Sequence, residues 1–354
     1  MPQVIALGDI NVDFIAHIPQ YPQPGEGGVA YQAQLYSGGS AANTALVLAR
    51  CGISVGLMAR VGRDALAAQT LVELLEAGVD GHQIQYDPEL TTGMMFVAVT
   101  PDGERTMFGY RGANTRLDPV FLQPDEIAGA KILHISGYAL LEPPQRDTAL
   151  RALDIARQAG IKISLDVSVE VAQDRKEQIQ NLLSRIDWIF PNELETKSLV
   201  GCVDNHQAVS KFLDYGLEMV ALKLGKKGCM IGTSEGVFTI PAFKVKVRDT
   251  TGAGDSFDAG FIAARLGGLD WRASGLLANA LGGLAASVNG AGESLPRPGD
   301  VLRLLESQGS NDAWQDWQDE IQAVQSLLRR SMLARPANIG SRWPSDRQGG
   351  TFRG

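Results

Sequence analysis

The chain has 354 residues, of which 44% are hydrophobic and 20% charged, which is enough to bury one large core and a smaller appendage. Its formal net charge of −8 argues against a general nucleic-acid-binding surface, so no nucleic-acid partner is expected. Three cysteines, Cys51, Cys202 and Cys229, are odd in number and too scattered for a metal cluster, which indicates buried thiols in a reducing, cytoplasmic setting.

Short apolar runs alternate with helical segments along the chain. Strands are predicted over residues 4–7, 54–59, 132–135, 162–166, 188–191 and 219–224. Helical patterns lie between them, for example over residues 65–77 and 145–158. This alternation predicts an α/β fold with a mainly parallel sheet covered by helices on both faces, and such sheets bind ligands at the carboxyl ends of their strands.

Two glycine-containing motifs follow the first predicted strand. In Gly8-Asp-Ile-Asn-Val-Asp13, the amide of Asn11 and the carboxylate of Asp13 suit paired hydrogen bonds to hydroxyls, although Asx turns explain them equally well. Further on, the Gly38-Gly39 pair precedes a small-residue helix that ends at Gly52. Taken alone, this second motif indicates tight helix packing as readily as function.

Two regions interrupt the βαβ pattern. Residues 12–35 are polar and rich in proline and glycine. Residues 92–100 and 105–111 predict a hairpin whose turn contains Asp102-Gly103. Together these regions predict a small β-sheet beside the main core.

A glycine turn is predicted near the end of the sheet. The alternating residues 243–247 predict a half-exposed strand, which leads into Asp249-Thr-Thr-Gly-Ala-Gly-Asp255. Glycines at 252 and 254 let successive N–H groups converge, and the helix that begins near Asp255 adds the positive end of its dipole, so the turn favours phosphate. A carboxylate at Asp255 fits a base that faces a hydroxyl, or a simple helix cap.

The C-terminal region contains two further helical patterns. Residues 273–292 are uncharged and long enough to span a membrane, but their serines, asparagines and glycines favour a buried helix and loop, so no membrane partner is expected. Residues 312–332 predict an amphipathic helix within a C-terminal extension over 307–332. Residues 333–354 are basic and rich in Gly, Pro and Ser, which predicts a disordered tail.

Two of these glycine-containing segments, the one over residues 37–52 and the one over residues 249–259, resemble the signatures of the PfkB carbohydrate kinase family. The resemblance extends over roughly residues 3–306 and implies a three-layer α/β/α ribokinase-like fold over residues 1–306, with a β-sheet lid from residues 12–35 and 92–111. It also implies transfer of the γ-phosphate of ATP to a hydroxyl of a small sugar. Because such lids also form dimer contacts in the family, a homodimer through the lid is expected.

The same resemblance assigns the sugar-binding residues. It implies contacts to the sugar from Asn11, Asp13, Gly38, Gly39, Asn43 and Glu142. In the lid, Arg105 and Arg111 are candidates to bind the carboxylate of an acid sugar. Two departures bear on the substrate: Ser40 replaces the lysine usual in ribokinases, and residues 166–170 lack the Asn and Arg common in keto-deoxygluconate kinases.

On the nucleotide side, the resemblance implies ATP with Mg²⁺ and a site for K⁺. Glu195 of the Asn-x-x-Glu motif would reach Mg²⁺ through water, although Asn192 to Glu195 also fits an ordinary helix start. The residues implied to line the nucleotide are Asn192, Lys223, Gly225, Gly228 and Asn279. Those implied to hold K⁺ are Asp249, Thr251, Gly290, Gly292 and Ser294.

Catalysis is expected at the glycine turn. Gly252, Ala253 and Gly254 would cradle the γ-phosphate, and Asp255 would act as the general base. Two alternatives stay open. One is a nucleoside kinase on the same scaffold, with lid aromatics available for base stacking; the other is a catalytically silent binding or assembly relative.

Overall fold

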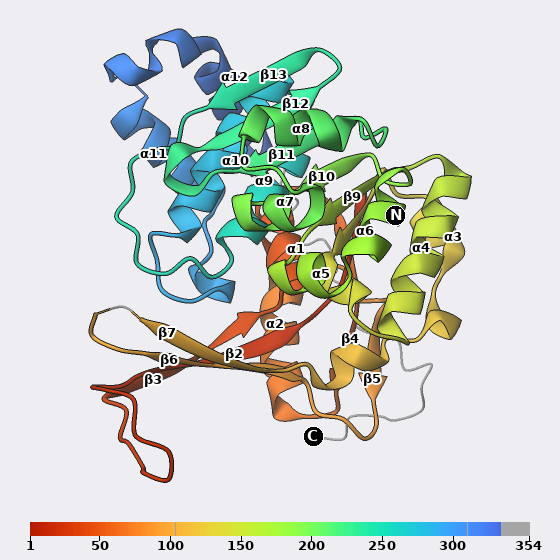
Figure 1. The fold of residues 1–354 in the computed structure, drawn as a ribbon, viewed down its shortest axis with the longest axis vertical. Coiled ribbons are helices and arrows are strands. Elements are labelled where there is room, and N and C mark those ends of the chain that lie inside the picture. The colour runs from red at the N-terminus through yellow and green to blue at the C-terminus, as the bar shows by residue number, and fades with distance from the viewer. Residues whose placement is uncertain (103, 310, 334–354) are drawn as a thin grey trace.

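The protein, in a computed structural model, is described over residues 1–102, 104–309 and 311–333. Within these ranges a nine-stranded central sheet has the order β13-β12-β11-β10-β9-β8-β1-β4-β5 (Figure 1). Its strands are β1 (Val4–Leu7), β4 (Val55–Gly62), β5 (Ile84–Asp87), β8 (Ile132–Ser136), β9 (Lys162–Asp166), β10 (Trp188–Phe190), β11 (Met219–Lys223), β12 (Cys229–Thr233) and β13 (Gly236–Ile240). All adjacent pairs from β5 to β11 are parallel, whereas β12 and β13 pair antiparallel at one edge.

Successive residues of the central strands join two different apolar cores. In β1, Val4 and Ala6 belong to one core, and Ile5 and Leu7 to the other. The first core is shared with α1 (Ser40–Arg50), α2 (Ala65–Glu76), α9 (Ala253–Leu266), α10 (Trp271–Ala285), α11 (Pro298–Gln308) and α12 (Gln318–Leu333). The second is shared with α3 (Pro124–Ala128), α4 (Gln145–Ala159), α5 (Val169–Asp174), α6 (Lys176–Leu183), α7 (Glu193–Val200) and α8 (Asn205–Leu213). The predicted three-layer α/β/α architecture is therefore confirmed.

A second sheet forms the lid, in the order β3-β2-β6-β7, and Figure 1 shows it as an arm that leaves the main body. Its strands are β2 (Asn11–His17), β3 (Gln32–Gly38), β6 (Gly93–Val99) and β7 (Arg105–Tyr110). The predicted hairpin is present as β6 and β7, with Val99 opposite Arg105. Of its predicted turn residues, Gly103 lies outside the described residues.

The lid sheet has two chemically different faces. Asp13 is buried on one face, whereas its neighbour Phe14 points to the other and is 37% exposed. Phe14 stacks on Phe96 with a centroid separation of 5.5 Å, and Phe96 contacts Phe108. One face therefore carries the buried carboxylate of Asp13, and the other is an exposed aromatic surface.

The prediction of a strand over residues 243–247 is wrong. This segment has no regular secondary structure, although Phe243 is buried and Lys244 is exposed. The backbone N–H and C=O of Lys244 bond to the side-chain amide of Gln308 instead of to a strand, at 3.0 and 2.7 Å. The alternating pattern thus reflects the burial of Phe243 beside the exposed Lys244. The backbone of Lys244 finds its hydrogen-bond partner in helix α11 and not in a neighbouring strand.

The C-terminal helix packs on this same segment. Helix α12 begins at Gln318, after a 3₁₀ turn over Asp312–Trp317, so the α-helical part of the predicted 312–332 helix starts later than expected. Trp314 in this turn is 4% exposed and stacks on Phe243, with ring centroids 4.2 Å apart. Of the predicted tail over residues 333–354, Leu333 ends α12, and residues 334–354 lie outside the described residues. Among the described helices, none is long and apolar enough to cross a membrane.

We predict that Trp314→Ala lowers the free energy of unfolding by about 3–5 kcal/mol, because it removes a large buried ring and leaves a cavity against Phe243. Urea denaturation followed by circular dichroism measures this change. Met332→Ala, at a half-exposed site of α12, is the matched control and should cost under about 1 kcal/mol. Equal effects of the two substitutions would show that the Trp314 contact does not anchor the helix.

Candidate active site

The predicted catalytic turn lies at the start of α9. Gly252 is the N-cap residue with φ 73°, and a Cβ there would lie 2.8 Å from the Leu295 side chain, so glycine is required on two grounds. The N–H of Ala253 already donates to the carbonyl of Thr250, at 3.2 Å. Gly254 and Asp255 are in the first helical turn, where N–H groups lack intrahelical acceptors, so these two are the N–H groups suited to an anion.

Helix α1 brings a second set of predicted residues to the same place. Gly39 precedes the helix with φ 96°, and a Cβ there would lie 2.3 Å from the carbonyl of Asp9. A Cβ on Gly38 would collide with the carboxylate of Asp13, at 2.5 Å. One turn into α1, Asn43 donates from Nδ2 to Oδ2 of Asp255 at 2.8 Å. The glycine pair therefore permits close packing, and Asn43 joins the two helix starts.

Two carboxylates of this site are hard to ionise. Burial, followed by repulsion from Asp255 and Asp249, raises the pKa of Asp13 from 3.8 to about 7. For Asp255, burial and then the Asp166 carboxylate raise the pKa to about 6, against the lowering effect of hydrogen bonds from Asn43 and Ser40. A carboxyl with a pKa near 6 is well matched to proton acceptance near neutral pH.

A buried ion cluster lies beside the glycine turn. The ammonium of Lys223, at the end of β11, lies 2.7 Å from Asp166 Oδ1 and 3.3 Å from Asp258 Oδ1. Burial lowers the pKa of Lys223, but the carboxylates of Asp166, Asp258 and Glu195 outweigh this and raise it overall. Burial raises the pKa of Asp258 against the lowering effect of Lys223, and the Asp166 carboxylate adds to the rise.

The turn after β1 is organised by a second polar cluster. The side chain of Arg111 bonds to both oxygens of Asp9, at 3.3 and 3.1 Å, and to Glu142 at 3.1 Å. Asn114 donates to Oδ1 of Asn11 at 2.8 Å and exchanges two bonds with the backbone of Ile10. Three predicted sugar ligands, Asn11, Arg111 and Glu142, therefore lie around this turn, where Asp9 and Glu142 share the charge of Arg111.

The lid contacts the main body through Arg105. Its guanidinium bonds to the carboxylate of Asp249 and, at 2.9 Å, to the hydroxyl of Thr250. Asp249 also accepts from the N–H of Thr251 at 2.9 Å and from the N–H of Gly290 at 2.9 Å. One carboxylate thus joins the lid to both loops of the predicted K⁺ site.

The second of these loops packs against the lid and is held from the other side. A Cβ on Gly290 would lie 2.6 Å from the ring of Tyr36 in β3. Ser294 ends a 3₁₀ turn, Gly292–Ser294, and the guanidinium of Arg50 donates to the carbonyl of Gly292 at 3.2 Å. Several oxygens of this region therefore already carry donors from the protein.

The predicted nucleotide residues lie farther along the sheet. Asn192 caps α7, and both carboxylate oxygens of Glu195 accept from it, at 2.8 and 2.7 Å, so the helix-start interpretation of this motif describes its contacts. Gly225 and Gly228 flank the turn between β11 and β12, both with positive φ. Asn279, buried in α10, donates to the carbonyls of Ile240 and Pro241, both at 3.1 Å.

Residues that sequence analysis did not assign complete the site. Asp166, Asp258 and Ser40 surround Lys223 and Asp255, and Asp9 and Asn114 position the turn after β1. Asp166 could have been predicted from the sequence, since it ends a predicted strand and parallel sheets bind ligands at the carboxyl ends of their strands. The sequence gives no comparable indication for Asp258, because it lies inside a helix and is fully buried.

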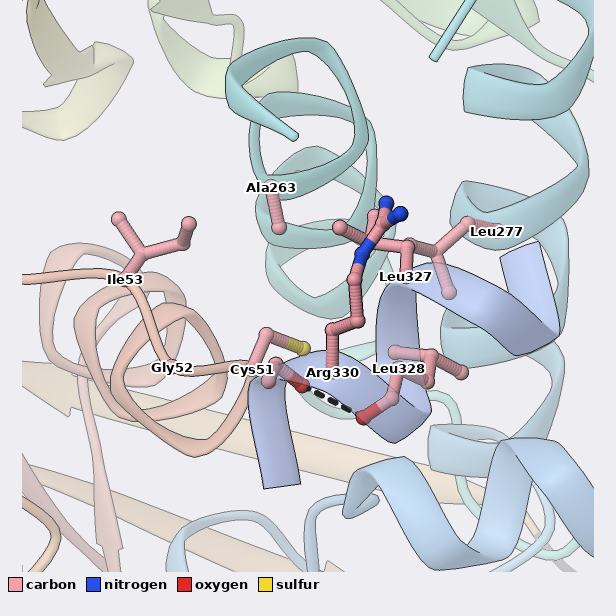
Figure 2. A pocket seen from close by; sticks show the side chains of 9 residues that line it. Cys51, Gly52, Ile53, Ala263, Leu277, Leu327, Leu328 and Arg330 are labelled. Carbon is pink, nitrogen blue, oxygen red and sulfur yellow. Dashed lines mark hydrogen bonds between the residues drawn. The ribbon is translucent and has the colours of Figure 1, made fainter. Parts of the chain in front are cut away.

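A separate pocket lies at the other end of α1 (Figure 2). Its volume is about 230 Å³, and its lining is mainly apolar, with Ile53, Leu277 and Leu327 among the side chains. It is bounded by Cys51 at the end of α1, about 16 Å along the helix from Ser40. This pocket is therefore distinct from the cluster of predicted catalytic residues.

Comparison with known proteins decides the family. Residues 1–298 match the profile described as pfkB family carbohydrate kinase. The chain belongs to this family. It is 31% identical over 308 residues to a ribokinase of Haemophilus influenzae, covering 85% of this chain and 97% of the relative. It is also 29% identical to fructokinase-1 of Oryza sativa subsp. japonica, with 86% and 98% covered.

A solved structure gives the same result at the level of the fold. The crystal structure of a candidate ribokinase II from E. coli, in complex with ATP and Mg²⁺, superposes with a TM-score of 0.79 at 26% identity, covering 87% of this chain and all of that one. The protein is accordingly a phosphotransferase that acts on a sugar hydroxyl. ATP and Mg²⁺ are thus bound in a solved structure with the same fold.

We predict that Asp13→Asn stabilises the protein more at pH 8 than at pH 5. Between pH 3.8 and about 7 the folded state binds the proton of Asp13 more tightly than the unfolded state, so its contribution to stability falls as the pH rises. Asparagine mimics the protonated carboxyl and should add roughly 1–4 kcal/mol to the free energy of unfolding at pH 8. Urea denaturation at both pH values measures this, and equal shifts at pH 5 and pH 8 would contradict it.

Proposed function

We propose that the protein transfers the γ-phosphate of ATP to a hydroxyl of a small neutral sugar, such as ribose or a ketose. The observation that carries this proposal is the convergence of Asp255, Asn43 and Asp13 on the anion-binding start of α9. The ribokinase and fructokinase relatives support a sugar acceptor rather than a nucleoside. Asn11, Asp13 and Asn43, with the backbone at Gly38 and Gly39, would bind the sugar hydroxyls.

A neutral sugar is favoured because the lid arginines already have acidic partners. Arg111 pairs with Asp9 and Glu142, and Arg105 pairs with Asp249. Binding a sugar carboxylate would require one of these ion pairs to break and would leave a partly buried acid without its partner. Glu142, neutralised by Arg111, would serve as a hydrogen-bond acceptor for a hydroxyl.

In the proposed reaction Asp255 accepts the proton of the sugar hydroxyl while the sugar oxygen bonds to the γ-phosphorus. The bond from that phosphorus to the β–γ bridging oxygen breaks, and ADP leaves with this oxygen. The N–H groups of Gly254 and Asp255 bind the oxygens of the transferring group, and Gly252 and Ala253 shape the turn that presents them. Closure of the lid over the sugar excludes water, which would otherwise compete as the nucleophile.

The cations are part of the same proposal. Mg²⁺ would reach the site on the phosphates of ATP and neutralise their charge, since it uses few protein ligands and keeps several waters. Over the described residues, no group of three or more His, Cys, Asp or Glu is arranged to hold a metal, which fits an ion that enters with the nucleotide. Glu195 would contact it through water. K⁺ would bind near Asp249, Thr251, Gly290, Gly292 and Ser294.

We predict that Asp255→Asn lowers kcat by roughly 10²- to 10⁴-fold, the usual size of a general-base contribution, with little effect on folding. A coupled assay measures ADP release from Mg-ATP in the presence of each candidate acceptor, with and without K⁺. The acceptors are ribose, fructose, other ketoses, 2-keto-3-deoxygluconate and nucleosides. Because Asp255 must be ionised and its pKa is about 6, kcat/KM for the wild type should fall as the pH drops below about 6. Asp319→Asn, exposed on α12, is the control. Turnover of the Asp255 variant at the control's rate would remove Asp255 from the mechanism.

We further propose that two copies of the chain associate through the lid. The outward face of the lid presents a continuous apolar surface whose side chains are 37–64% exposed, comprising Phe14, Leu35, Met94, Phe96, Phe108 and Tyr110. Exposed apolar patches of this kind are typical of interaction sites. A second lid would cover the patch with a matching surface, and the relation would be symmetric.

We predict that Phe108→Lys converts the dimer to a monomer, since it places a charge within the proposed apolar contact and should weaken association by roughly 100-fold or more. Size-exclusion chromatography with light scattering measures the mass at several concentrations. Val203→Lys, at a loop residue that is 84% exposed, should leave the mass unchanged. A monomeric wild type, or a dimer that persists in Phe108→Lys, would refute the lid contact.

A further inference from the structure

Lys223 is held in an unusual place for a residue that only lines a nucleotide. It is the last residue of β11, and its backbone N–H donates to the carbonyl of Pro191 at 2.8 Å. Its side chain is mostly buried, with 15% of its surface exposed. Asp166 and Asp258, on two other elements, hold the ammonium at 2.7 and 3.3 Å.

The ammonium is directed at the catalytic turn. A Cβ built on Gly254 would lie 3.5 Å from Nζ of Lys223, so only the missing side chain of this glycine separates the two groups. An ammonium has three N–H donors, and the bonds to Asp166 and Asp258 use two of them. Across the described residues Nζ has no third acceptor. Its remaining hydrogen is therefore available to a group bound at the start of α9.

The neighbourhood of Ser40 leads to the same place. Ser40 begins α1, and its hydroxyl lies 3.5 Å from Asp166 Oδ2, on the oxygen opposite the one that binds Lys223. Position 40 therefore supplies no cation, while Lys223 brings one to the other side of the same carboxylate. The site contains Asp13, Asp255, Asp166 and Asp258, so an incoming triphosphate would meet strong repulsion without a nearby positive charge.

From this geometry we propose that Lys223 is a catalytic residue that binds the γ-phosphate of ATP and the transferring phosphoryl group, with Asp166 and Asp258 as positioning residues that aim it past Gly254. This inference rests on the proposed kinase function and adds a specific phosphate ligand to it. Lys223 stays protonated throughout and exchanges no proton. Its contribution is a charge-assisted hydrogen bond, aligned in advance, to the oxygens that gain charge in the transition state.

The test compares the affinities of wild type and Lys223→Met for Mg-ATP and Mg-ADP by titration calorimetry, without sugar. If Lys223 binds the γ-phosphate, the substitution should weaken Mg-ATP binding by about 10- to 100-fold and change Mg-ADP binding by less than about threefold. Lys223→Arg should retain part of the preference for ATP. Lys226→Met, on an exposed lysine of the following turn, is the matched control and should behave as wild type.

Two outcomes would overturn the proposal: affinities for both nucleotides that stay unchanged in a folded Lys223→Met, or affinities that fall by the same factor. If the loss of the ammonium unfolds the protein, the double variant Lys223→Met with Asp166→Asn removes both members of the ion pair and is judged by the same ATP-to-ADP ratio. Because no sugar is present, the ratio is independent of the substrate. Wild type that binds both nucleotides but phosphorylates no sugar would contradict the proposed function and leave the Lys223 result intact.

Discussion

The hydrogen bond between Asn43 and Asp255 is the contact on which the arrangement of the site depends. It joins the first turns of α1 and α9, which arrive from opposite ends of the sequence, and it is 2.8 Å long in a partly buried setting. Thr44 adds a weaker bond to the backbone of Asp255 at 3.5 Å. With both helix starts tied together, the glycine pair proposed to bind the sugar lies beside the turn proposed to bind phosphate, as transfer between two bound substrates requires.

This convergence concentrates negative charge. Asp13, Asp166, Asp255 and Asp258 lie together, and burial raises the pKa of three of them, Asp13, Asp255 and Asp258. Such an arrangement costs stability, because an ionised carboxylate that is buried lacks the hydration that it has in water. Lys223 offsets part of the cost through its bonds to Asp166 and Asp258, and Asn43 does the same for Asp255. The groups that tolerate poor electrostatics in the free protein are those placed nearest the reacting atoms, as is common in active sites.

How far the sequence predicts the structure differs between elements. Strand β1 has its predicted bounds because all of its residues are apolar, as a strand buried on both faces demands. Strand β9 also has its predicted bounds, although only Ile163 and Leu165 in it are apolar. The β12–β13 hairpin was not predicted. Val209 of α8 packs directly on β12 at Gly232, so this position carries a glycine rather than an apolar side chain that would indicate a strand. In the site, Gly252, Gly254 and Asp255 were predicted from local turn chemistry. Asp258 could not be, because only the tertiary packing of α9 brings it to Lys223.

The lid connects the proposed sugar-binding residues to the turn at the start of α9. Its inward face carries Asp13, while Arg105 on β7 bonds to Asp249 and Thr250, immediately before the catalytic turn. Asp249 in turn holds Gly290, which packs on Tyr36 at the base of the lid. A movement of β7 away from the body would therefore break the Arg105 contacts and release one of the supports of the 249–251 loop. Since Gly252 follows this loop directly, the contacts of Arg105 connect the position of the lid to the geometry of the turn at the start of α9, and in the proposed function closure of the lid over the sugar would align the proposed phosphate site in the same step.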